Sequence, residues 1–292
     1  MSSYRFCRTD DIGLLVDALN RCWRPHFPDE EPVTPATFQR SIRDLQVWCS
    51  SCMVAFSGSD PIAVLIGAKR PGATLIQKIA VHPDHLRQGH GRHMLASIGS
   101  KLAILGPPRM AAEIPERLTA ASALFTACGY VEEAVLTDYA VDLDHYNVRD
   151  LPGAAASAVR LDDRRNFLVP LTVDDLAANG LLEAHPQACW ERSAETLTAR
   201  KDELTGLAVA SDEQIEACIL YLTDGEILAL RSFADDHGVR VRKLLSQLRA
   251  AGLRSARLPK VHPDEIPREW PIMLGLRPVG THRVYAATAR SD

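Results

Sequence analysis

The sequence predicts an α/β protein made of two domains with a similar plan, and three observations carry this prediction. Residues 75–96 read as a buried strand, a short loop with two glycines and a helix. The run from Phe167 to Leu176 resembles the run from Tyr4 to Ile12, with an Asp-Asp pair and an aliphatic residue at the end of each. The chain has 292 residues, which is long for one compact domain and enough for two that each bury a core.

The composition excludes several functional classes. Hydrophobic residues make up 46% of the chain, charged residues 24%, and the net charge is −4. This balance is ordinary for a soluble protein and lacks the basic excess of nucleic-acid-binding proteins. No apolar run approaches the roughly 18 residues of a membrane helix, and the N-terminus lacks the pattern of a signal peptide. We therefore expect a cytoplasmic protein with neither a membrane nor a nucleic-acid partner.

The seven cysteines are an odd number and are scattered mostly through apolar segments, which is typical of reduced core residues. Cys49 and Cys52 have the spacing of a redox pair. They lie in a strand-like run, however, and not at a helix start, where a thiolate would be stabilised. We interpret them as structural.

The first half of the chain alternates strands and helices. Thr9, Asp10 and Asp11 supply a cap and first-turn acids for a helix from Ile12. The expected order is a strand at 4–8, a helix at 12–23, a helix at 37–45, strands at 52–56 and 62–68, the strand ending at 81, a helix to 105, a strand at 109–114, a helix at 119–127 and a strand-like run at 131–143. Gly58-Ser59-Asp60 indicates a hairpin between the second and third strands.

The loop at 25–35 is rich in proline and acid and contains Asp29, Glu30 and Glu31. Two interpretations stay open. The acids are a solvated surface loop, or they attract a cationic amine.

The second half repeats the plan after a linker. Residues 145–165 have linker composition, so we expect domains at 1–144 and 166–292. Each half carries a glycine, at Gly129 and Gly275, followed ten residues later by a Tyr-Ala pair, and a repeat of this length is a whole duplicated fold.

The second copy departs from the first at its loop. Its central strand is expected at 227–231, and the next helix contains Val241. We place Val239 and Val241 where the first copy has Gly89 and Gly91. Valine keeps the backbone away from a phosphate, and Asp235 and Asp236 repel one. This predicts a degenerate second domain.

The loop of the first copy has a chemical use. The first N–H groups of a helix have no partner within the helix, and a loop without Cβ atoms lets them close on a phosphate. The P-loop and the dinucleotide fingerprint both require glycine patterns that are absent here.

The succession of a strand, V-H-P-D, a basic loop, G-x-G and a helix resembles the pyrophosphate-binding segment of the GNAT acyltransferase superfamily. The C-G-Y at 128–130, closing a helix, resembles that family's ending as well. One departure is that the family's first arginine or glutamine falls on Leu86, with Arg87 and Gln88 following.

The resemblance implies two GNAT-like α/β (α+β) domains, each a mixed, mostly antiparallel sheet flanked by helices. It also implies acetyl-CoA, or another acyl-CoA, as co-substrate. The residues it places beside coenzyme A are Ile79, Val81, Arg87, Gln88, Gly89, His90, Gly91, Arg92 and Phe125.

The catalytic groups of the family are only partly matched. Phe125 stands where the family often has a tyrosine that protonates the thiolate, and a phenyl ring cannot do this. The central strand offers Gln77 and Lys78 where the family often has a glutamate. Glu113 on the next strand is the best nearby carboxylate, either as a base acting through water or as a structural acid.

Four histidines, at positions 82, 85, 90 and 93, do not have side chains expected to converge, so we expect no metal. His90 beside a pyrophosphate would serve charge complementarity.

Three functional classes remain. The first is an N-acyltransferase acting on a small-molecule or peptide amine, with the two copies forming a pseudo-dimer within one chain. The second is a coenzyme A-binding or regulatory module without turnover, and the third is an O-acyltransferase.

Overall fold

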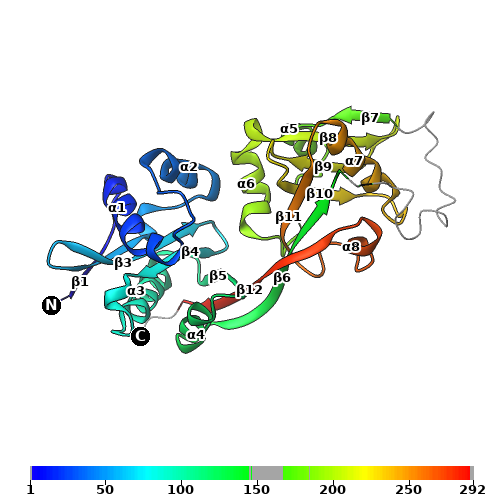
Figure 1. Ribbon diagram of the computed structural model, residues 1–292. Helices are drawn as coiled ribbons and strands as arrows, with labels where there is room; N and C mark the ends of the chain where they lie inside the picture. Colours follow the sequence, from blue (N-terminus) through cyan, green and yellow to red (C-terminus); the bar gives the residue numbers. More distant parts are fainter. Residues whose placement is uncertain (1, 145, 147–166, 184, 290–292) are drawn as a thin grey trace. The chain divides into compact units, whose positions relative to one another are not determined.

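The computed structural model describes residues 2–144, 146, 167–183 and 185–289 (Figure 1). The chain forms two compact units. Unit 1 comprises Met1–Ala134 together with Arg283–Asp292, and unit 2 comprises Val135–His282. Each unit has a mostly antiparallel sheet flanked by helices, which confirms the predicted fold class.

Unit 1 follows the predicted order of elements. They are β1 (Ser2–Phe6), α1 (Ile12–Cys22), α2 (Pro35–Leu45), β2 (Met53–Ser57), β3 (Asp60–Lys69), β4 (Thr74–Val81), α3 (His90–Leu105), β5 (Arg109–Pro115), α4 (Thr119–Ala127) and the start of β6 (Val131–Asp142). Short 3-10 turns lie at Arg24–His26, Cys49–Ser51 and Pro83–His85. Helix α2 starts at Pro35 because Thr34 and Thr37 form a reciprocal cap at its N-terminus.

The sheet of unit 1 opens between two of its strands. Strands β1 to β4 pair antiparallel in sequence order, and β5 then adds parallel to β4. Among the described residues, the pairing of β4 with β5 is confined to Thr74 with Met110 and Leu75 with Ala111. From Ile76 onward the two strands diverge, so the backbone of β4 is not covered by its neighbour there.

The two faces of this sheet bury different helices. Met53 and Leu65 share a core with Met94 of α3 and Phe125 of α4. Val54 and Val64 are also fully buried but point to the opposite face, because strand side chains alternate. Helix α1 packs on β3 from that opposite face, with Leu15, Val16, Ala18, Leu19 and Cys22 buried.

Unit 2 repeats this order. Its elements are β7 (Phe167–Pro170), α5 (Val173–Ala178), α6 (Ala194–Ala199), β8 (Thr205–Ala210), β9 (Ile215–Tyr221), β10 (Ile227–Ser232), α7 (Val239–Ala250), β11 (Ser255–Val261), α8 (Trp270–Met273) and β12 (Arg277–Thr288). Strands β7 to β10 form an antiparallel sheet in sequence order, as β1 to β4 do. A single parallel bridge, Glu226 with Arg257, joins the β10 and β11 region.

The last strand of each copy contributes to both units. Residues of β6 from Val135 onward belong to unit 2, where they pair antiparallel with β11. Residues of β12 from Arg283 onward belong to unit 1, where β12 follows β5 in the sheet order. Tyr285 and Ala289 are buried in the core of unit 1. The domain boundaries expected from sequence stay a prediction, and the expected linker at 145–165 lies outside the described residues except for Tyr146.

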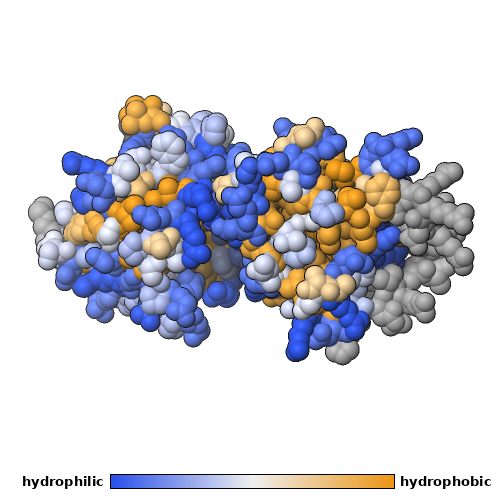
Figure 2. All heavy atoms as spheres, turned by 90° about the horizontal axis from the view of Figure 1, so that it is seen from above, coloured by the Kyte–Doolittle hydropathy of each residue, from blue (hydrophilic) through white to orange (hydrophobic). Residues whose placement is uncertain are grey.

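The surface is mixed in character. Figure 2 shows hydrophilic side chains over the surface of each unit, with apolar patches among them. The large apolar side chains that are exposed are Trp48, Leu86, Ile104, Leu105, Val131, Phe167, Phe233, Ile272 and Val279. None of the described helices combines the length and apolar composition of a membrane span.

Candidate functional site

A cavity of about 260 Å³ lies in unit 1 where β4 and β5 diverge. One wall is the end of β4, from Ile76 to Val81, and the other is Ala112–Pro115 of β5. Leu118, Leu124 and Phe125 of the α4 region add apolar surface. The edge of β4 that β5 leaves unpaired therefore borders a largely apolar cavity, which suits an elongated ligand that needs backbone hydrogen bonds.

The mouth of this cavity carries an aromatic cluster from the segment after α1. Trp23 and Phe27 stack with ring centroids 4.3 Å apart. His26 places its Nε2 2.8 Å from the carbonyl oxygen of Val81, at the end of β4. The Nζ of Lys78 lies 4.2 Å from the centroid of the Trp23 ring. The cluster holds the segment after α1 against the open edge of β4.

The glycine loop leads from β4 into α3 and leaves backbone donors free. Gly89 is the N-cap residue with φ +88°, and Arg87 is also left-handed with φ +62°. In the described part of the chain, no side chain accepts from the N–H groups of residues 87–92. A Cβ at Gly89 would meet nothing within 4 Å, so the space beside this N–H cluster is open. The geometry suits an anion at the start of a 16-residue helix.

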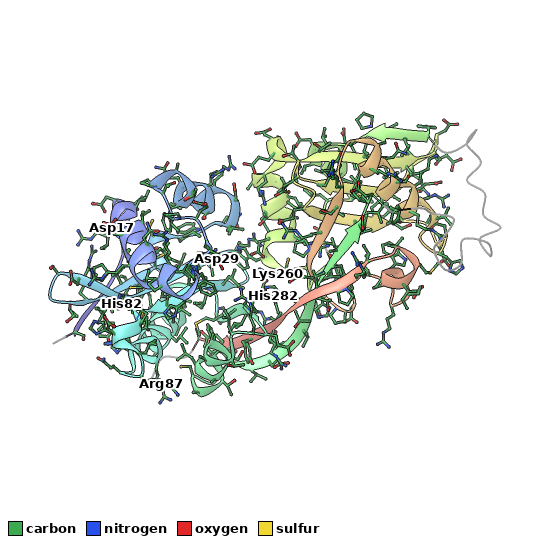
Figure 3. The ribbon with its side chains drawn as sticks, in the orientation of Figure 1. Asp17, Asp29, His82, Arg87, Lys260 and His282 are labelled. Atoms are coloured by element: carbon green, nitrogen blue, oxygen red, sulfur yellow. The ribbon has the colours of Figure 1, made fainter. Side chains whose placement is uncertain are left out.

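The expected ligand side chains around this loop point in different directions. Arg87, Gln88 and Arg92 are exposed, and Figure 3 shows Arg87 directed outward from the loop before α3. His90 is instead 5% exposed, with Nδ1 2.5 Å from the Tyr4 hydroxyl and Nε2 buried without a partner in the described residues. Burial and the neighbouring His85 and His93 lower the pKa of His90. A neutral His90 therefore packs under the loop.

Gly91 allows two helices to pack closely, in addition to any role in binding a ligand. A Cβ there would come within 2.9 Å of the Leu124 side chain, so its absence lets α3 approach α4 closely. Leu124 in turn lines the cavity.

The structure brings four of the sequence-predicted positions together around the cavity. Ile79, Val81, Glu113 and Phe125 line it directly, as does Leu86, the residue that departs from the family pattern. Phe125 is 1% exposed and packs edge-on against Tyr130, with ring centroids 4.9 Å apart. The loop residues 87–92 lie apart from these, at the start of α3.

Sequence reasoning missed the aromatic cluster and set Lys78 aside. Trp23 and Phe27 follow a helix end, where they resemble ordinary packing residues. Lys78 follows the polar Gln77, where the register of β4 against β3 shifts, so alternation along the sequence did not indicate the direction of its side chain.

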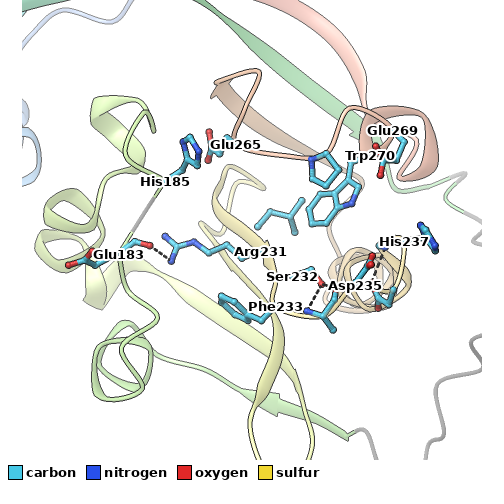
Figure 4. A pocket seen from close by; sticks show the side chains of 15 residues that line it. Glu183, His185, Arg231, Ser232, Phe233, Asp235, His237, Glu265, Glu269 and Trp270 are labelled. Atoms are coloured by element: carbon cyan, nitrogen blue, oxygen red, sulfur yellow. Dashed lines mark hydrogen bonds between the residues drawn. The ribbon is translucent and has the colours of Figure 1, made fainter.

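Unit 2 has a cavity of about 360 Å³ at the corresponding end of β10 (Figure 4). Its lining includes Arg231, Trp270 and several acids, Glu183, Asp235, Asp236, Glu265 and Glu269. The Arg231 guanidinium donates to the backbone carbonyls of Leu181, Leu182 and Glu183. This cation is therefore engaged with backbone and not directed at an anion.

The start of α7 corrects one expectation. Gly238, and not Val239, is the N-cap residue, and its φ of +76° matches that of Gly89. Counted from the helix start, Arg240 corresponds to Gly91. The left-handed glycine is therefore retained in both copies, and the substitution of valine for Gly89 inferred from the sequence is wrong.

The difference between the copies lies in what accepts from the helix donors. The Asp236 carboxylate, 2% exposed, accepts from the N–H of Gly238 at 3.0 Å and of Arg240 at 2.8 Å. The Arg240 guanidinium also donates to Asp236 at 2.9 Å and pairs with Glu216. The anion position at α7 is thus filled by the chain's own carboxylate, whereas the position at α3 is open.

Comparison with known proteins agrees with this geometry. The sequence model of the Acetyltransferase (GNAT) family matches residues 14–130. Residues 14–130 thus carry the sequence pattern of a GNAT-family domain. The match spans the open sheet edge and the glycine loop of unit 1, and no curated protein matches the sequence.

Solved structures resemble this chain in fold over nearly its whole length. A tandem GNAT protein from the clavulanic acid biosynthesis pathway, without AcCoA, aligns over 100% of both chains with a TM-score of 0.68 and 16% identity. A putative acetyltransferase from Pyrococcus horikoshii aligns over 99% of this chain and 90% of its own, with a TM-score of 0.60 and 14% identity. A GCN5-related N-acetyltransferase from Sphaerobacter thermophilus aligns over 99% and 96%, with a TM-score of 0.64 and 14% identity. At these identities the likeness is one of fold.

Proposed function

We propose that unit 1 transfers an acyl group, an acetyl group in the simplest case, from acyl-CoA to an amine. The proposal rests on one observation: unit 1 contains two stretches of backbone whose hydrogen-bonding groups are open to a ligand. Among the described residues, the N–H groups at the start of α3 have no side-chain acceptor, and β4 is no longer paired with β5 beyond Leu75. The first surface suits the pyrophosphate of coenzyme A and the second suits its amide-containing arm.

In this proposal the residues of unit 1 divide the work. Backbone N–H groups from Arg87 to Arg92 hold the pyrophosphate, and the exposed Arg87 and Arg92 add positive charge. The backbone of Ile79–Val81 orients the thioester carbonyl at the cavity. Apolar walls exclude water, which strengthens a hydrogen bond to the carbonyl oxygen as negative charge develops there.

Proton transfer involves fewer groups than binding does. Glu113 lines the cavity and is the candidate base, acting through a water molecule on the acceptor ammonium. Phe125 has no proton to donate to the departing thiolate, so water or another group supplies it. The acidic side chains in the segment after α1, including Glu30, favour a cationic amine as the acceptor.

The role we propose for unit 2 is structural or substrate-shaping, as one half of a pseudo-dimer within the chain. Its helix donors are occupied by Asp236, which leaves the anion position filled. Titration with acetyl-CoA should accordingly saturate at one molecule per chain.

A matched pair of glycine variants tests the binding site. Gly89 and Gly129 have φ values of +88° and +82°, and a Cβ at either would meet nothing within 4 Å. Gly89→Ala and Gly129→Ala should therefore lose similar stability, about 1 kcal/mol each, from the left-handed backbone. Only Gly89→Ala places a methyl group beside the phosphate donors. At about 100 times its Kd, acetyl-CoA should stabilise the wild type and Gly129→Ala by about 2.7 kcal/mol and Gly89→Ala by much less. Equal stabilisation of all three would contradict the site.

A second candidate function is a coenzyme A-binding module without turnover. Leu86 and Phe125, the two departures from the family pattern, favour it because neither supplies a polar group to the cavity. Release of free thiol from acetyl-CoA, measured against a panel of amines and then of alcohols, separates the candidates. Release with an amine supports N-acylation, release with alcohols alone supports O-acylation, and binding without any release supports the module.

A further inference from the structure

Lys78 is the only amine-bearing side chain among the residues that line the cavity of unit 1. It lies on β4, directly before Ile79–Val81, where β4 pairs with β3 but not with β5. Its side chain is 22% exposed, and its Nζ sits over the Trp23 ring. The amine is therefore held at the mouth of the cavity, between Trp23 and Glu30.

Two opposing effects act on the charge of Lys78. Burial lowers its pKa, and Glu30, whose Oε2 lies 3.4 Å from Nζ, opposes this effect. That carboxylate also accepts from Nε1 of Trp23 at 2.9 Å and is 48% exposed, so solvent screens it. A lysine amine must lose its proton before it can act as a nucleophile, and burial of this kind is the usual means.

We propose that Nζ of Lys78 is itself an acyl acceptor, so that the chain acylates its own cavity. This inference rests on the proposed function, because acyl-CoA is the acyl donor. The neutral amine attacks the thioester carbonyl, the C–N bond forms and the C–S bond breaks. The amine loses its second proton, and coenzyme A leaves as the free thiol. The products are an Nε-acyl-lysine and one thiol, with no oxidant or further reactant.

The modified lysine is an end state and not a transfer intermediate, because an amide does not pass its acyl group readily to another amine. Acylation removes the charge of Lys78 and so ends its ion pair with Glu30. It also places the acyl group at the cavity mouth formed with Trp23 and Phe27. The modified residue therefore narrows the route by which an acceptor reaches the site. The extent of modification also shows how accessible the site has been to acyl-CoA.

Lys101 is a matched control for this inference. Its pKa is also lowered by burial, and its Nζ lies 3.9 Å from the centroid of the Phe6 ring. It donates to the carbonyl oxygen of Ser50 and does not line the cavity. The two lysines thus share burial and an aromatic contact and differ in position. If position decides, only Lys78 is acylated rapidly.

The test is intact-mass analysis and peptide mapping of the full chain after incubation with acetyl-CoA. We expect one acetyl group per chain, located at Lys78 in the wild type and in Lys101→Arg. Lys78→Arg should lose at least nine-tenths of this label. The rate at Lys78 should reach its plateau at lower pH than the rate at Lys201, whose pKa is raised by the hydrogen bond to Asp174.

Parallel measurement of thermal stabilisation by acetyl-CoA separates failure of this inference from failure of the proposed function. If acetyl-CoA stabilises the chain and thiol is released to an amine, but Lys78 stays unlabelled, the inference is wrong and the proposed function stands. If label spreads evenly over exposed lysines, or matches that of the urea-unfolded chain, the inference is also wrong. If acetyl-CoA neither stabilises nor labels the chain, both are wrong. Mapping of the wild type decides the matter even if Lys78→Arg fails to fold.

Discussion

At the scale of single residues, the site of unit 1 is built from apolar side chains with few titratable groups. Phe125 is 1% exposed, lies at the cavity and packs against Tyr130. Burial raises the pKa of the Tyr130 hydroxyl, which bonds only the sulfur of Met110 at 3.6 Å among the described residues. Neither aromatic residue is a ready proton donor to a thiolate. The backbone therefore carries more of the proposed chemistry than the side chains do.

The variant Phe125→Tyr tests this conclusion. The added hydroxyl either points into the cavity or is buried without a hydrogen-bond partner. The second case lowers the free energy of unfolding by about 1–3 kcal/mol. We expect turnover of acetyl-CoA to be unchanged or raised, because a possible acid is added and nothing needed is removed. Steady-state thiol release and urea unfolding measure the two effects. A large loss of turnover with coenzyme A affinity intact would show that the phenyl ring contacts the reacting groups.

At the scale of elements, the two units differ in what the carboxylates at the N-termini of their helices bind. Asp11 at the start of α1 accepts two hydrogen bonds from Arg5 of β1, each 2.8 Å, and one from the N–H of Arg8. The Arg5 hydrogen bonds hold the pKa of Asp11 at about 2. This carboxylate links the first strand to the first helix, whereas Asp175 at the start of α5 forms a reciprocal capping box with Thr172.

The variant Asp11→Asn should cost about 1 kcal/mol at neutral pH, because Arg5 is 45% exposed and solvent screens the pair. The pKa of Asp11 is lower in the folded than in the unfolded chain, where it is about 3.9. The stabilisation is therefore complete above about pH 5 and is lost as the pH falls toward about 2. Urea unfolding of wild type and variant across this range should converge at low pH. Asp10→Asn is the control and should stay within about 0.5 kcal/mol of wild type.

The helix start of α7 gives a sharper prediction. Asp236 is buried and accepts from two backbone N–H groups and from Arg240. Asp236→Asn removes the charge and leaves some of these donors unpaired, so we expect a loss of about 2–4 kcal/mol. The neighbouring Asp235 is exposed, and Asp235→Asn should change stability by less than about 0.5 kcal/mol. Denaturant unfolding compares them, and equal effects would mean that Asp236 does not cap α7.

At the scale of the whole molecule, the chain returns at its end to complete the unit in which it began. Tyr285 and Ala289 are buried with residues of β2, α3 and α4. Arg283 forms ion pairs with Glu116 and Glu132 in the same unit. Unit 1 is therefore not contained in the first half of the sequence, although its glycine loop is.

A chain ending at Asp144 should consequently lose the cooperative unfolding of unit 1, because it lacks the last strand. The full-length variant Tyr285→Ala should lose about 3–5 kcal/mol, as deletion of a buried aromatic ring does, whereas Tyr285→Phe keeps the ring and should lose much less. Calorimetry with and without acetyl-CoA measures both. A shortened chain that unfolds cooperatively and is stabilised by acetyl-CoA as the full chain is would contradict this account.

Local features were within reach of sequence reasoning. The strand at 75–81, the glycine loop and the helix after it depend on residues close together in the chain, and apolar periodicity with glycine and proline positions predicts them. The repeat of this plan after residue 166 was visible for the same reason. The exact start of the helix in the second copy was not predicted correctly. It depends on which residue adopts the left-handed conformation, and this residue is Gly238, whereas the sequence comparison had aligned Val239 with Gly89.

What the sequence by itself determined is the order of strands and helices in both copies and the glycine that opens the first anion position. Only the tertiary structure decided that β4 and β5 diverge after Leu75 and that Lys78 lies against Trp23. It also decided that Asp236 accepts hydrogen bonds from the backbone N–H groups at the start of α7. It also decided that residues from Arg283 onward belong to unit 1. The reason is physical. Local conformation follows from propensities and caps within a few residues, whereas these contacts join segments whose proximity depends on how the whole core packs.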